Sequence, residues 1–69
     1  MNAESAAKQL DAVLRQYPWF VSVGVGEQQR GPTLFVYVSS MNAFKRSNIG
    51  ESWEGFHVEP RVMRGLRLT

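Results

Sequence analysis

Few side chains in this chain of 69 residues could do chemistry: it contains one histidine and no cysteine. A zinc site needs several histidine, cysteine or carboxylate ligands at defined spacing, and His57 alone cannot supply them. The nearby Glu51, Glu54 and Glu59 do not show the spacing of a metal-binding or acid-base carboxylate set. We therefore predict no metal site and no cofactor, and we interpret His57 as a surface residue of a strand.

Motifs for a nucleophile and for nucleotide binding are also missing. The segment Gly50-Glu51-Ser52-Trp53-Glu54 lacks the closing glycine of a Gly-x-Ser-x-Gly turn. Gly24 and Gly26 lack the third glycine of a dinucleotide-binding loop, and a strand follows them instead of a helix. We expect Gly24 to allow a close approach or a bulge and Gly26 to begin a turn. The chain is therefore predicted not to be an enzyme.

Length and composition favour one small domain spanning 1–69. A domain of this size gains little net stability from its core alone, and without cysteine no disulfide can add to it. Association with a second copy or with another protein is the common remaining way to bury more area. The acidic, alanine-rich start lacks the apolar segment of a signal peptide, and the longest apolar run, 19–25, is far short of the ~20 residues of a membrane span. We expect a soluble, cytoplasmic protein that does not enter a membrane.

The net charge of +2 comes from the C-terminal half. Residues 31–69 contain three glutamates and five basic residues, Lys45, Arg46, Arg61, Arg64 and Arg67. Dedicated nucleic-acid modules usually carry a denser stripe of lysine and arginine.

The stretch 19–39 predicts an antiparallel hairpin, because two runs of β-branched and aromatic residues flank a polar loop at 27–32 that contains glycine and proline. Side chains alternate between the two faces of a strand. Pairing like with like places the aliphatic side chains on one face: Val21, Val23, Val25, Leu34, Val36 and Val38. The opposite face would carry Phe20, Ser22 and Gly24 from the first strand, and Phe35, Tyr37 and Ser39 from the second.

Two helices are predicted on either side of the hairpin. The first begins at an Asn2 cap and runs to about Tyr17, with apolar residues in one stripe, and Pro18 ends it. Its apolar positions are Ala6, Leu10, Val13, Leu14 and Tyr17. The second is short, covers 40–48, starts at a serine cap and points Met41 and Phe44 inward.

A third strand is predicted at 56–63, after a turn at 51–55 that places Trp53 against the core. Its alternation puts Phe56, Val58 and Val62 on one face and His57, Glu59 and Arg61 on the other. Pro60 cannot donate a main-chain hydrogen bond, so the strand should lie at an edge or break there. The tail 64–69 could extend this strand or pair with another chain.

The predicted fold is therefore an α+β two-layer sandwich of order α-β-β-α-β, with both helices on the valine face of a three-stranded sheet. The third strand could pair with the first strand, or in parallel with the second. Three segments resemble small bacterial α-β-β-α-β domains that are found alone or ahead of trypsin-like peptidase domains: Val23-Gly24-Val25-Gly26, Gly31-Pro32-Thr33-Leu34-Phe35-Val36-Tyr37-Val38, and Trp53-Glu54-Gly55-Phe56-His57-Val58-Glu59, with Ile49 before the last. The resemblance covers about residues 10–63. It implies the fold and no activity, because the peptidase residues have no counterpart.

The uncovered sheet face is the predicted functional surface, formed by Phe20, Phe35, Tyr37, His57 and Arg61. Contiguous exposed aromatic residues usually mark an interface. We therefore expect a homodimer or a complex with a protein partner, joined through this face or an edge strand, in which Phe35 and Tyr37 lose exposure. The alternative is binding of single-stranded nucleic acid, with bases stacked on Phe35 and Tyr37 and basic residues at the phosphates.

Overall fold

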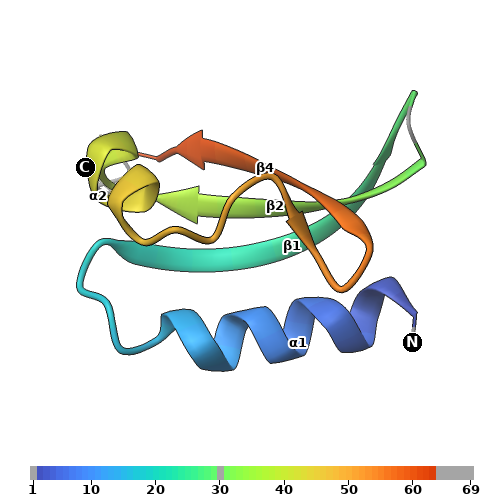
Figure 1. Cartoon of the computed structure of the whole chain (residues 1–69), viewed down its shortest axis with the longest axis horizontal. Coiled ribbons are helices and arrows are strands. Elements are labelled where there is room, and N and C mark those ends of the chain that lie inside the picture. Colours follow the sequence, from blue (N-terminus) through green and yellow to red (C-terminus); the bar gives the residue numbers. More distant parts are fainter. Residues whose placement is uncertain (1, 30, 64–69) are drawn as a thin grey trace, which may run out of the picture.

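A computed structural model describes residues 2–29 and 31–63. Its elements are α1 (Ala3–Leu14), β1 (Phe20–Gln28), β2 (Gly31–Val38), α2 (Met41–Arg46), β3 (Ser52–Trp53) and β4 (Phe56–Val62) (Figure 1). The four strands form one mixed sheet in the order β1-β2-β4-β3. The fold is thus α+β, but the prediction of three strands is wrong by one. The predicted role of the tail 64–69 lies outside the described residues.

α1 begins where the sequence predicts it and ends earlier. The Oδ1 of Asn2 accepts a hydrogen bond from the Ser5 N–H at 2.8 Å, which caps the first turn. The helix lies along one face of the sheet beneath β1 and β2, and Leu10 and Leu14 are fully buried against it (Figure 1). The predicted end near Tyr17 is wrong, because the helix ends at Leu14 and residues 15–17 form a turn and a bend before Pro18. Val13, which we placed in the buried stripe, is 40% exposed.

β1 and β2 form the predicted hairpin with one irregularity. Val23 lies opposite Val36 and Val25 opposite Leu34, so these valines share the aliphatic face as expected. A bulge between Phe20 and Ser22 shifts the register by one residue. Upstream of it the faces are exchanged: Phe20 pairs with Val38 and packs against the core, whereas Val21 is 43% exposed.

The hairpin loop is shorter than predicted, since β1 continues to Gln28 and β2 starts at Gly31. Gly26 therefore lies inside a strand and does not begin the turn. Gly31 has a φ of 101°, a left-handed conformation that favours glycine. Pro32 fits into β2 because pairing with β4 begins only at Thr33, so no N–H is needed there.

The chain between β2 and β4 contains α2 and a small strand. The Oγ of Ser40 accepts from the Ala43 N–H at 3.3 Å and caps α2, whose Phe44 is buried in the same core as α1. The predicted turn at 51–55 is in fact a hairpin, in which β3 pairs antiparallel with the start of β4. Glu54 and Gly55 have φ values of 51° and 84°, as two-residue hairpin loops require. Trp53 packs against the core, as predicted.

β4 pairs in parallel with β2, which decides between the two strand orders left open by the sequence. The Val58 N–H turns away from β2 and donates to the Glu51 carbonyl at 2.9 Å, whereas the Met63 N–H donates to Val38 at 2.8 Å. Because main-chain groups alternate, Pro60 faces the same side as Val58, away from β2. β3 reaches only as far as His57 on that side. The predicted edge position is therefore wrong for β4 as a whole, which lies between β2 and β3, but Pro60 lies in the part of the strand that β3 does not reach.

Replacement of Val36 by aspartate should unfold the domain. Val36 is fully buried on the helix side of β2, so the variant would place a charge among aliphatic side chains at a cost of several kcal/mol. That cost is comparable to the whole stability of a small domain, about 5 kcal/mol at the low end of the usual range. Val62→Asp is the matched control, because Val62 is 41% exposed on the neighbouring strand and should change stability by about 0.5 kcal/mol. Circular dichroism melts that show the opposite order of stability would invert the assignment of faces.

Candidate functional site

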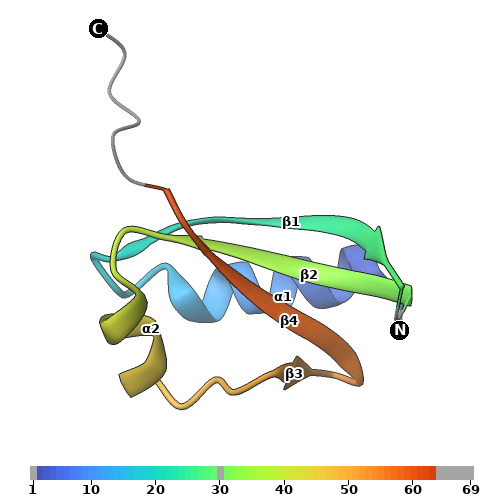
Figure 2. The same ribbon diagram turned by 90° about the horizontal axis from the view of Figure 1, so that it is seen from above.

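The sheet face opposite α1 is here called the open face. It consists of three rows of residues, one each from β1, β2 and β4. In Figure 2, α1 lies behind β1 and β2, and neither α2 nor β3 lies in front of these strands. The pairing registers assign the members of each row. The β1 row is Ser22, Gly24 and Gly26; the β2 row is Thr33, Phe35 and Tyr37; the β4 row is His57, Glu59 and Arg61.

Four of the five predicted interface residues share this face. Phe35 lies opposite Glu59 and Tyr37 opposite Arg61, while His57 lies opposite Thr33. Phe20 does not belong to the face, because the bulge that follows it turns its side chain toward the core. The open face is therefore smaller than predicted and lies on the central part of the sheet.

The two aromatic rings lie over glycine positions of the neighbouring strand. A Cβ atom added to Gly26 would lie 2.5 Å from Cε2 of Phe35, far inside van der Waals contact. A Cβ atom added to Gly24 would lie 3.5 Å from Cε2 of Tyr37, which is an ordinary contact. Phe35 and Tyr37 are both half-buried. The glycines of β1 thus seat the aromatic rings, an arrangement known to compensate for glycine in edge strands.

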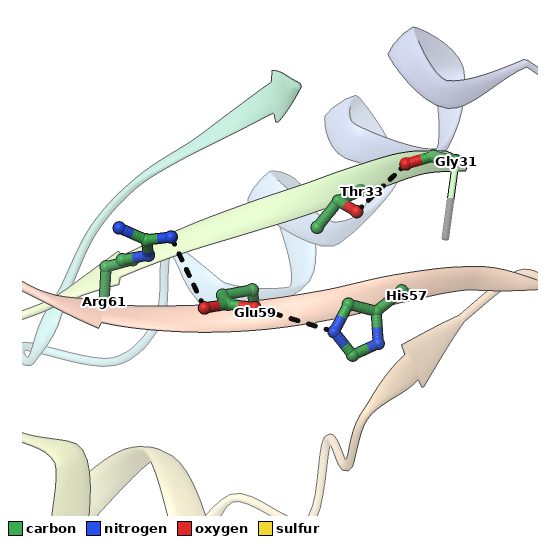
Figure 3. Close-up of polar contacts among 5 residues, drawn as sticks. All are labelled: Gly31, Thr33, His57, Glu59 and Arg61. Atoms are coloured by element: carbon green, nitrogen blue, oxygen red, sulfur yellow. Dashed lines mark hydrogen bonds and ion pairs between the residues drawn. The ribbon is translucent and has the colours of Figure 1, made fainter. Parts of the chain in front are cut away.

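The β4 row, here called the charged row, contains the ion pair of Glu59 and Arg61, with His57 beside it (Figure 3). Glu59 lies between the other two, with Oε2 at 3.4 Å from Arg61 Nη2 and Oε1 at 3.7 Å from His57 Nε2. The Arg61 guanidinium also lies over the Phe35 ring, with its carbon 5.1 Å from the ring centroid, which is within cation-π distance. Arg61 therefore connects the charged row to the aromatic row.

Thr33 is a member of the open face that sequence reasoning did not select. It is fully buried, and its hydroxyl donates to the Gly31 carbonyl at 3.2 Å (Figure 3). Glu59 was also not selected, although the alternation in 56–62 places it between His57 and Arg61. The seating of rings over glycines gives no signal in one strand alone, since it depends on the register between two strands.

Basic residues do not gather on this face in the part of the chain that the structure describes. Lys45 and Arg46 belong to the last turn of α2. Arg46 lines a hollow with Tyr17 and Trp19, whose rings stack at 4.9 Å. Arg64 and Arg67, which the nucleic-acid hypothesis also uses, lie outside the described residues.

Comparison of the chain with protein-family models, with curated proteins and with solved structures found no match. The open face must therefore be interpreted from its own chemistry. Within 2–29 and 31–63, no group of three or more histidine, aspartate or glutamate side chains could hold a metal ion. No helix in these ranges is long and apolar enough to cross a membrane.

Gly26→Ala should destabilise the domain by about 1 to 3 kcal/mol, since the new methyl group would displace the Phe35 ring. Gly24→Ala is the matched control on the same strand and face. It has room for the methyl group and should be neutral or stabilising by up to about 1 kcal/mol, because alanine restricts the unfolded chain. Urea unfolding measures both changes. If the ring causes the loss, Gly26→Ala should cost much less in a Phe35→Ala background; equal costs in both backgrounds would contradict the proposed contact.

Proposed function

We propose that this domain is a non-enzymatic interaction module that binds a protein partner through the open face. The observation that carries the proposal is the pair of aromatic rings of Phe35 and Tyr37, which are seated on Gly26 and Gly24 and are only half-buried in the domain. Tyrosine and arginine are enriched among the residues that dominate binding energy, and interface cores are rich in aromatic side chains. Tyr37 and Arg61 lie opposite each other here.

The rings are held in place before any partner arrives. Binding ordinarily costs about 0.5 to 1.5 kcal/mol for each flexible side chain that becomes immobile. Phe35 is confined between the β1 main chain and the Arg61 guanidinium, so little of this cost remains. A flat, preorganised aromatic surface favours a partner that offers apolar side chains.

The charges of the β4 row indicate what the partner should carry beside those apolar groups. Only Nη2 of Arg61 approaches Glu59, and half of the Arg61 side chain is exposed. A guanidinium has five N–H donors, so several remain for a carboxylate of the partner. We therefore propose an apolar segment flanked by an acidic residue as the bound element.

The nucleic-acid alternative has less support from this arrangement. Glu59 lies at the centre of the charged row, next to the Phe35 ring, where it would repel a phosphate. In fluorescence anisotropy at low salt, we expect micromolar protein not to bind mixed-sequence single-stranded RNA or DNA. Binding that weakens steeply as salt increases, as counterion release requires, would favour the alternative over a protein partner.

The resemblance to domains that occur alone or ahead of peptidase domains is compatible with an accessory binding role. β3 is an addition to the α-β-β-α-β order on which the resemblance rests. We also propose that the protein is located in the cytoplasm.

Site-specific crosslinking tests the proposed face. A photoreactive phenylalanine analogue in place of Tyr37 should capture one defined protein in cells, whereas the same analogue at Val13, exposed on α1, should not. The purified partner should then bind at least tenfold more weakly to the Phe35→Glu, Tyr37→Lys double variant in titration calorimetry. Arg61→Ala provides a second variant that leaves the rings in place. Unchanged affinity in both variants, with circular dichroism showing folded protein, would rule out the open face as the binding site.

A further inference from the structure

The free edge of β1 is a second surface that differs from the open face. β1 is an outer strand of the sheet, so only β2 pairs with it among the described residues. Just past the end of β2, the Ser39 N–H donates to the Trp19 carbonyl on the β1 side. The Val38 carbonyl accepts from the Met63 N–H on the opposite side. Odd-numbered residues of β2 therefore turn their main-chain groups toward β1.

This alternation identifies which β1 groups are free. Gly24 lies opposite Phe35 and Gly26 opposite Thr33, so both glycines direct their main-chain groups inward. Val23 and Val25 must then direct their N–H and C=O groups outward, where they can pair with another strand. The side chains of Val21 and Val25 are 43% and 46% exposed along the same strand. Edge strands are usually protected by proline or by charged residues such as lysine. Between Phe20 and Gly26, β1 contains no proline and no charged residue.

α1 presents a stripe of charges beside this edge. A groove between the helix and β1 is lined by Lys8 and Asp11 on the helix, by Arg15 at its C-terminal cap, and by Ser22 and Val23 on the strand. Glu4 lies on the same side of the helix, one turn before Lys8. Asp11 and Arg15 pair at 2.7 Å, whereas neither Glu4 nor Lys8 forms an ion pair within the described chain.

The order of these charges is complementary to itself. Along α1 it runs negative, positive, negative and positive, at positions 4, 8, 11 and 15. Positions 4 and 15 are equally far from the midpoint of the stripe, and so are positions 8 and 11. An antiparallel copy of the helix would therefore place Arg15 opposite Glu4 and Asp11 opposite Lys8. A parallel copy would place like charges together.

We propose that two copies of the chain form a symmetric homodimer through the β1 edge and this α1 stripe. α1 and β1 run in opposite directions along the same axis of the molecule (Figures 1 and 2), so one twofold axis makes both the strand pair and the helix pair antiparallel. Val23 lines the same groove as Lys8 and Asp11, the two inner charges of the stripe, so we place the axis near Val23. The exposed Val25 of each copy then lies beside the exposed Val21 of the other.

The dimer has a definite consequence for the shape of the molecule. Joining two four-stranded sheets edge to edge gives one sheet of eight strands, with the two α1 helices on one side. The two open faces then point in the same direction. The dimer depends on Val23, Val25 and the charges beside them on α1, none of which belongs to the open face, so its failure would leave the proposed binding function standing, and the reverse also holds.

Two charge variants test the helix part of the interface. Lys8→Glu with Arg15→Glu makes the stripe wholly acidic, and Glu4→Lys with Asp11→Lys makes it wholly basic. Light scattering after size-exclusion chromatography should show a dimer for wild type at high micromolar concentration and a monomer for each variant, with dissociation constants raised at least tenfold. An equimolar mixture of the two variants should form a heterodimer. A monomeric wild type, or a mixture that stays monomeric although both variants are folded, would overturn the proposal.

A second pair of variants tests the strand part. Val25→Lys adds a charge to the free edge and should abolish the dimer, whereas Val62→Lys adds the same charge to an equally exposed strand position away from it. Val62→Lys should therefore remain dimeric. If the dimer persists in Val25→Lys but is lost in the Phe35→Glu, Tyr37→Lys variant, the copies pair through their open faces, and the proposed edge-to-edge arrangement is wrong.

Discussion

The alternation of β2 is the constraint on which the rest of the structure depends. Its even-numbered side chains, Leu34, Val36 and Val38, are fully buried in the core that α1 covers, and its odd-numbered side chains form the central row of the open face. The main chain alternates as well, turning toward β1 at odd positions and toward β4 at even positions. This one strand therefore contributes side chains to the core, carries the two aromatic rings of the open face and pairs with both neighbouring strands. A shift of one residue in its register would exchange the two faces together.

Local chemistry made much of this fold predictable from the sequence. Asn2 and Ser40 are strong helix caps, and each begins a helix as expected. The alternation in 33–38 is unbroken, so its two faces were assigned correctly. Proline has no N–H to donate, so a strand cannot pair fully on both sides at Pro60, and one side of β4 could be predicted to be unpaired there. In each case, the residues that determine the structure are neighbours in the chain.

The errors arise where distant segments decide the outcome. The bulge after Phe20 inserts one residue relative to β2, and nothing in the β1 sequence shows where that insertion falls. Phe20 was therefore assigned to the wrong face. β3 is too short to show a periodic pattern, and it exists because Glu54 and Gly55 fold Trp53 back onto Phe56. The contact between Phe35 and Gly26 crosses diagonally from one strand to the other, since Phe35 lies directly opposite Gly24.

The glycines of β1 influence both the open face and the free edge of β1. Without a Cβ, Gly24 and Gly26 let the rings of Phe35 and Tyr37 lie close to the main chain, which removes side chains from the open-face side of β1. Val23 and Val25, which alternate with these glycines, direct their main-chain groups to the free edge, and the first charged residue of the strand is Glu27. The opposite side of the sheet is different, because Pro60 and β3 reduce the pairing capacity of β4. The glycines that allow a flat aromatic face thus also leave β1 as the longer and less protected edge of the sheet. A substitution at Gly24 or Gly26 would therefore change the open face and the edge together.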